Sequence, residues 1–176
     1  MSPSSARTLL LTGPPRVGKS TLIRRVANAL CDWRIRGFIT DEIREAGQRV
    51  GFQLNTFDGR SFVIAHEGIH SRRRVGKYGV DVEALEGVAT SALHPDEDVD
   101  VYLVDEIGPM ECLSQAFVAA VRELLDSDCK TVATIHRSTG GFIGEVKRRP
   151  DVELRQVTSH NRDEMLEDVL EWIRPH

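Results

Sequence analysis

The chain has 176 residues, of which 40% are hydrophobic and 28% are charged, so it can form one domain with its own core and has the composition of a soluble globular protein. Its formal net charge of -4 disfavours a nucleic-acid partner, because proteins that bind nucleic acids usually carry an excess of basic residues. No apolar run approaches the length of a membrane span and segment 1–8 lacks the apolar core of a signal peptide, so we expect no membrane contact and a cytoplasmic location.

The first part of the chain is typical of a strand, a loop and a helix. Segment 7–12 is an apolar run that ends at a glycine, and apolar residues recur at helical spacing over 19–30. Between them, residues 13–20 read GPPRVGKS and match the phosphate-loop pattern G-x-x-x-x-G-K-[ST] in full. Backbone N–H groups of such a loop point at phosphate oxygens, and the positive end of the next helix adds to the attraction. We therefore expect Lys19 to reach the β- and γ-phosphates and the Ser20 hydroxyl to bind Mg²⁺.

The next segment predicts a strand followed by an antiparallel insert. Segment 35–43 is rich in strand-forming residues and ends near Asp41 and Glu42. Residues 49–67 hold two such runs around the dipeptide DG, which indicates a hairpin because glycine supplies the positive φ that the turn requires.

The rest of the chain alternates between helices and strands. We expect helices at 80–93, 113–127 and 161–173, and strands at 99–106, 130–135 and 152–158. Ser114 stands where it can cap the second of these helices. The alternation predicts a three-layer α/β fold in one domain over 1–176, with a mainly parallel sheet covered on both faces and the hairpin inserted into it.

Two acids end the apolar strand at 99–106. Ligands of parallel sheets bind at the edge formed by the carboxyl ends of the strands. Asp105 is suited to anchor Mg²⁺ through a water molecule. Glu106 is suited to act as a general base that places water in line with the γ-phosphate. Asp41 and Glu42 end another expected strand and could face the same phosphates, so Glu42 remains an alternative base.

Several further motifs follow one another along residues 8–170: GPPRVGKSTLI, GFITDEIR, GQRVGF, RVGKYGVD, VDEIGPME, ATIHR and NRDEML. With these motifs in this order, the chain resembles the thermophile-type nucleoside-triphosphatase family, which is also found in archaea and animals. RVG-x-Y together with DEIG-x-ME is specific to that family. The resemblance implies a RecA-like P-loop NTPase that uses Mg²⁺ to hydrolyse ATP, GTP, CTP and UTP slowly and with little base preference.

The resemblance also implies a set of nucleotide-binding residues. The cradle consists of Gly13, Pro14, Pro15, Arg16, Val17, Gly18, Lys19, Ser20 and Thr21. The strand end adds Asp105 and Glu106, followed by Gly108. Arg162 begins the last expected helix and could stack on the base, whereas a helix N-cap is the simpler role for its neighbour Asn161.

Arg16 departs from the family pattern, which has glycine at this position. If the position needs positive φ, a residue with a Cβ atom costs on the order of 1 kcal/mol there. The loop survives such a cost. We expect the guanidinium to point to solvent, and the alternative is that it folds back onto a phosphate.

A cation that meets the charge developing on the γ-phosphate would speed the reaction. The candidates are Arg74, Arg137, Arg162 and Arg44. Arg74 comes first, because a family motif passes through it. Thr134 could sense the γ-phosphate, and His136 could contact the substrate.

Three functions compete for this phosphate loop. The leading one is hydrolysis of a nucleoside triphosphate by Lys19, Glu106 and Arg74 in a monomeric protein. A nucleotide or small-molecule kinase would use the hairpin and the basic segment SRRRVGK as acceptor site and lid. A nucleotide switch is the third, although the chain lacks the N-K-x-D motif that reads guanine in such proteins.

Overall fold

The computed structural model describes residues 6–174 of the chain. Within these residues one sheet contains nine strands: β1 (Thr8–Thr12), β2 (Ile35–Glu45), β3 (Gln48–Thr56), β4 (Ser61–His66), β5 (Arg74–Val75), β6 (Tyr78–Val80), β7 (Val101–Ile107), β8 (Thr131–Ile135) and β9 (Val152–Gln156). The helices of the same residues are α1 (Lys19–Ala29), α2 (Val82–Ala92), α3 (Gln115–Asp126), α4 (Gly141–Lys147) and α5 (Met165–Ile173), with a short 3₁₀ helix η1 (Glu111–Leu113). None of these helices has both the length and the apolar character needed to span a bilayer.

The sheet has a parallel half and an antiparallel half. Its order is β5-β6-β4-β3-β2-β7-β8-β1-β9, and the pairs from β2 to β9 are all parallel. The remaining pairs are antiparallel, and they include the predicted hairpin of β3 and β4. The α/β fold with a parallel centre and an antiparallel insert is therefore confirmed.

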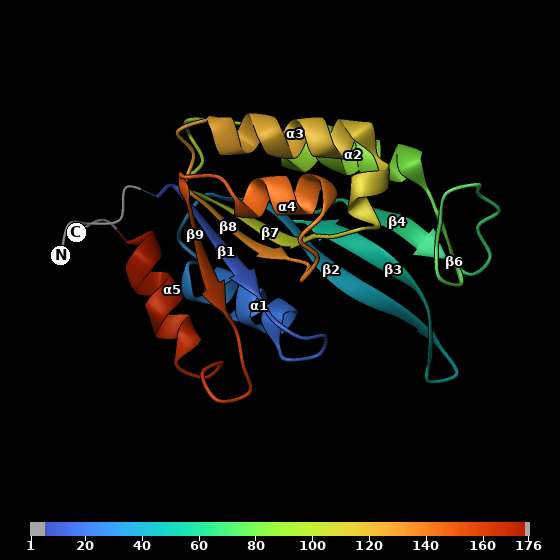
Figure 1. Cartoon of the computed structure of the whole chain (residues 1–176), viewed down its shortest axis with the longest axis horizontal. Coiled ribbons are helices and arrows are strands. Elements are labelled where there is room, and N and C mark those ends of the chain that lie inside the picture. The colour runs from blue at the N-terminus through green and yellow to red at the C-terminus, as the bar shows by residue number, and fades with distance from the viewer. Residues whose placement is uncertain (1–5, 175–176) are drawn as a thin grey trace.

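The antiparallel half is larger than the sequence indicates. Strand β2 continues to Glu45 and turns through Ala46 and Gly47, which have φ of 49° and 77°, directly into β3. Two successive residues with positive φ form the kind of tight turn that suits a hairpin, because its twist matches that of the strands. The β2–β3 arm, residues 35–56, therefore extends well beyond the parallel centre of the sheet (Figure 1).

Helices cover both faces of the sheet, as predicted. Helices α1 and α5 lie on one face, and α2, α3 and α4 lie on the other (Figure 1). Strand β1 explains this arrangement, since Leu9 and Leu11 pack on the first face and Leu10 on the second, and all three are fully buried. A strand buried on both faces reads as a continuous apolar run rather than an alternating one.

The last helix begins later than predicted. It starts at Met165 with Glu164 as its N-cap, and residues 161–164 form a turn. The side chain of Asn161 instead bridges that turn, since it accepts a hydrogen bond from the Thr158 N–H and donates one to the carbonyl of Gln156. The helix-capping role for Asn161 was therefore wrong, whereas Ser114 caps α3 through the Phe117 N–H as predicted.

Candidate active site

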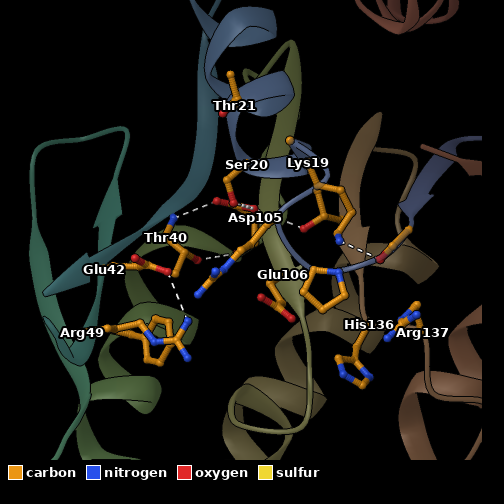
Figure 2. Close-up of a pocket in the computed structure, with 16 residues that line it drawn as sticks. Lys19, Ser20, Thr21, Thr40, Glu42, Arg49, Asp105, Glu106, His136 and Arg137 are labelled. Atoms are coloured by element: carbon orange, nitrogen blue, oxygen red, sulfur yellow. Dashed lines mark hydrogen bonds and ion pairs between the residues drawn. The ribbon is translucent and has the colours of Figure 1, made fainter. Parts of the chain in front are cut away.

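A cavity of about 400 Å³ lies at the carboxyl ends of β1, β7 and β8, and the phosphate loop enters it. The residues that line it come from distant parts of the chain (Figure 2): Gly13, Pro15, Arg16, Gly18, Lys19, Ser20, Thr21, Thr40, Glu42, Arg49, Phe52, Asp105, Glu106, Thr134, His136 and Arg137. Most of the predicted nucleotide-binding residues are in this set. Of the others, Pro14 and Val17 belong to the same loop, Gly108 lies behind Glu106, and Arg162 touches the loop from outside.

The loop itself has two residues in the left-handed region. Gly18, the N-cap of α1, has φ of 110°, a conformation that only glycine adopts without strain. Arg16 has φ of 61°, so the positive φ expected at this position is present although the residue carries a Cβ atom. The Arg16 side chain is exposed and lines the mouth of the cavity, with no hydrogen-bond or ion-pair partner among residues 6–174.

Lys19 lies across the loop. Its Nζ donates hydrogen bonds to the carbonyls of Gly13 at 2.8 Å and Pro14 at 3.0 Å. Burial lowers the pKa of Lys19, and the negative charges of Glu106 and Asp105 oppose that effect. The ammonium group is thus held at the centre of the loop, within the electrostatic range of both acids.

Asp105 is the most buried acid of the cavity, with an exposed fraction of 1%. Its carboxylate accepts hydrogen bonds from Ser20 Oγ at 3.0 Å, the Thr40 N–H at 3.0 Å and Thr134 Oγ1 at 3.2 Å. Burial raises the pKa of Asp105, while these three donors counteract the rise by stabilising the ionised form. Thr134, considered as a phosphate sensor, therefore also orients this carboxylate.

Glu106 owes its position to an irregularity in β7. The register between β7 and β8 shifts between Val104 and Ile107, and Glu106 has φ of 98°. Such a bulge re-aims a side chain, here into the cavity, and a non-glycine residue at this φ is strained. Burial raises the pKa of Glu106, and the charge of Asp105 raises it further.

Behind Glu106 lies a second glutamate that sequence reasoning missed. A Cβ atom placed on Gly108 would lie 2.9 Å from Glu106 Oε1 and 2.9 Å from Glu111 Oε2, so both carboxyl groups use the space that glycine leaves free. Glu111 is 4% exposed, and burial together with the charge of Glu106 raises its pKa to about 8. The only sequence feature that pointed to Glu111 was its place in the motif VDEIGPME.

The four candidate arginines have different surroundings. Arg137 lines the cavity beside His136, and no described residue accepts a hydrogen bond from it. Arg74 lies on β5 outside the cavity lining, where it donates to the carbonyl of Lys77 at 2.7 Å. Arg162 donates to the carbonyl of Val17 at 3.4 Å. The structure therefore places Arg137, and not Arg74, in the cavity that the phosphate loop lines.

Arg44 and Glu42 form a pair on the β2–β3 arm. Glu42 accepts hydrogen bonds from Arg44 Nη2 at 2.5 Å and from Arg49 Nη1 at 3.2 Å. Although burial raises the pKa of Glu42, these two arginines hold it below the usual value. A carboxylate with a lowered pKa is a weak base, so the surroundings favour Glu106 over Glu42 as the base.

Comparison with known proteins places the chain among enzymes. A family model described as NTPase matches residues 8–170. Nucleoside-triphosphatase THEP1 of Thermotoga sp. (strain RQ2) is 37% identical over 167 residues, which cover 94% of this chain and 95% of that protein. The crystal structure of THEP1 from the hyperthermophile Aquifex aeolicus matches with a TM-score of 0.84 at 33% identity, over 96% of this chain and 99% of that one. The solution structure of a human cancer-related nucleoside triphosphatase matches with a TM-score of 0.80 at 34% identity, over 96% and 98% of the two chains.

Proposed function

The chain belongs to this nucleoside-triphosphatase family, and from that premise we propose that it hydrolyses nucleoside triphosphates to the diphosphate and phosphate with Mg²⁺ and with broad base tolerance. The observation that carries the proposal is the convergence of four groups on one cavity. Lys19 and Ser20 come from the phosphate loop, and Asp105 and Glu106 come from the end of β7. The absence of an N-K-x-D motif from the sequence supports the base tolerance.

The phosphate loop holds the triphosphate tail in this proposal. Its backbone N–H groups and the start of α1 attract the phosphate oxygens. Lys19, now bonded to the carbonyls of Gly13 and Pro14, exchanges these partners for oxygens of the β- and γ-phosphates. Because the loop already places the ammonium group at its centre, little reorganisation accompanies binding.

The oxygen atoms of Ser20 and Asp105 fit a magnesium ion. Ser20 Oγ and Asp105 Oδ1 are 3.0 Å apart at the cavity wall, and Mg²⁺ prefers hydroxyl, carboxylate and water oxygens. Ser20 would bind the ion directly and Asp105 through a water molecule, with Thr40 and Thr134 orienting the carboxylate. When bound, Mg²⁺ would neutralise charge on the phosphates.

Glu106 is the base in this proposal. Its carboxylate accepts a proton from a water molecule whose oxygen attacks the γ-phosphorus, and the bond to the β-phosphate breaks with its electron pair staying on the diphosphate. Burial and the neighbouring Asp105 raise the pKa of Glu106, which makes it a better proton acceptor than an exposed glutamate. Arg137, unpaired among the described residues, replaces Arg74 as the cation that meets the transition-state charge.

Phosphate release from ATP, GTP, CTP and UTP tests the proposal. With Mg²⁺ we expect turnover of all four within about tenfold of one another, and none with excess chelator. The same reactions are scanned for phosphorylated nucleosides, nucleotides and small alcohols as acceptors. Phosphate transferred to an acceptor faster than to water would favour a kinase and overturn the hydrolase.

A further inference from the structure

The segments GQRVGF and RVGKY play no part in the chemistry derived so far, yet they meet in the structure. Arg49 on β3 donates from Nε to Tyr78 Oη at 2.9 Å, and Lys77 Nζ donates to the carbonyl of Arg49 at 3.0 Å. The rings of Phe52 and Tyr78 pack edge to face with centroids 5.2 Å apart. The side chains of Arg49, Phe52 and Tyr78, together with that of Glu42, form what we call the Arg49 cluster.

The cluster holds the guanidinium group of Arg49 in a fixed orientation. The group lies 5.0 Å above the Phe52 ring and 5.8 Å from the Tyr78 ring centroid. Nε is bonded to Tyr78 and Nη1 to Glu42, whereas Nη2 has no acceptor among residues 6–174. An arginine whose orientation is set by its neighbours loses little conformational freedom when it binds an anion.

The cluster is also part of the cavity wall. Glu42, Arg49 and Phe52 line the same cavity as Lys19 and Glu106. In Figure 2, Glu106 lies between Arg49 on one side and Arg137 on the other. The β2–β3 arm therefore brings a cation to the wall opposite β8.

The Arg49 cluster and the adjacent Arg44 together carry a surplus of positive charge that an anion could neutralise. Glu42 carries the only carboxylate paired with Arg49 among the described residues, and it is shared with Arg44. Two arginines and one glutamate give this group a net positive charge. The hydrogen bond from Arg49 to Tyr78 raises the pKa of Arg49 above its ordinary value, so Arg49 stays charged at every physiological pH.

We propose that Arg49 is a catalytic residue that binds the terminal phosphate of the triphosphate, and that Tyr78 is its positioning residue. This inference rests on the proposed function. In a phosphate loop the β-phosphate lies inside the loop and the γ-phosphate lies beyond it, towards the strand-end acids. A rigid guanidinium fork on the far wall would contact oxygens that a nucleoside triphosphate has and a diphosphate lacks.

The test compares two ligands on three variants. Binding of a non-hydrolysable ATP analogue and of ADP, each with Mg²⁺, is measured by calorimetry on the wild type, Arg49→Gln, Arg49→Lys and Tyr78→Phe. We expect Arg49→Gln to lower the affinity for the analogue about tenfold or more and the affinity for ADP by less than about twofold. Arg49→Lys should recover part of the lost affinity, since lysine keeps the charge but not the planar guanidinium. Tyr78→Phe should lower the affinity for the analogue but not for ADP, and by a smaller factor than Arg49→Gln does.

Equal weakening of both ligands, or no change in either, would overturn the assignment. Selective weakening in Tyr78→Phe decides the question should Arg49→Gln fail to fold, because that variant keeps the ring and its packing. Failure of the proposed function has a different signature. The wild type would then bind both nucleotides without releasing phosphate, whatever the ratio of affinities in the Arg49 variants.

Discussion

Ser20 Oγ donates a 3.0 Å hydrogen bond to Asp105 Oδ1, which joins the start of α1 to the end of β7 across 85 positions of sequence. Thr40 and Thr134 hold the same carboxylate from the strands on either side of β7. The two oxygen groups that we propose to hold magnesium are therefore oriented by the protein itself. This arrangement predicts how each side chain responds to substitution.

Asp105→Asn should weaken the response to Mg²⁺ while the nucleotide still binds. The amide has the shape of the carboxylate but not its charge, and loss of an outer-shell partner typically lowers metal affinity about 10- to 100-fold. We expect half-maximal phosphate release to need that much more Mg²⁺. A titration that matches the wild type would show that Asp105 does not act on the metal.

Glu106→Gly should stabilise the fold while it removes the proposed base. Positive φ at a non-glycine residue costs on the order of 1–3 kcal/mol, and glycine relieves most of it. Glu106→Ala is the matched control, because it also removes the carboxylate but retains a Cβ atom. We expect urea unfolding to give Glu106→Gly a free energy of unfolding about 1 kcal/mol higher than Glu106→Ala. An alanine variant as stable as the glycine variant would mean that φ of 98° is not strained.

Glu111→Gln should flatten the dependence of stability on pH. Unfolded chains release the Glu111 proton near its ordinary pKa of 4.5, whereas the folded chain retains it up to about pH 8. The unfolded state therefore binds fewer protons between these values, and stability falls as pH rises, by up to about 1.4 kcal/mol per pH unit.

Glutamine cannot titrate, so the Glu111→Gln variant should lose that part of the slope. Chemical unfolding at pH 5.5 and pH 8, without nucleotide or metal, measures it. Glu106→Gln provides the control. The pKa of Glu106 is also raised, so Glu106 makes its own contribution to the pH dependence of stability. A wild type and a Glu111→Gln variant with the same slope would show that Glu111 is ionised throughout.

The phosphate loop and the acids of β7 could be predicted from sequence because each depends on neighbours in the chain. The pattern of residues 13–20 and the apolar run before Asp105 are local features. Their meeting follows from topology, since the carboxyl ends of parallel strands share one edge of the sheet. The direction of the Glu106 side chain could not be predicted in this way, because it depends on a bulge that arises from the pairing of β7 with β8.

The Arg49 cluster could not be predicted from local patterns. It depends on the continuation of β2 through the turn at Ala46 and Gly47, and on the contact between β3 and Tyr78. The motif through Arg74 favours that arginine on sequence grounds, but β5 is an edge strand of the sheet, far from the phosphate loop in the strand order, and Arg74 donates to a nearby carbonyl. Helix α4 was also missed, because its seven residues include two glycines and are too few for a clear period.

Arg16→Gly should increase stability and leave nucleotide binding intact. Glycine adopts φ of 61° freely, so we expect a free energy of unfolding higher by about 0.5–1 kcal/mol. The exposed guanidinium has no described partner, so its removal should change kcat by no more than a few fold. Arg16→Ala separates the two effects, because it removes the guanidinium and keeps the backbone strain. Loss of nucleotide binding in Arg16→Gly would show that the arginine belongs to the phosphate cradle.

The most direct test of the central claim is to measure ATP affinity and single-turnover phosphate release together in Glu106→Gln. Glutamine preserves the size of the side chain and the backbone, but it cannot accept a proton from water. We expect the variant to bind Mg²⁺ and ATP within about threefold of the wild-type affinity and to release phosphate at least about 100-fold more slowly. Phosphate release at the wild-type rate from a fully loaded variant would show that Glu106 does not activate the attacking water.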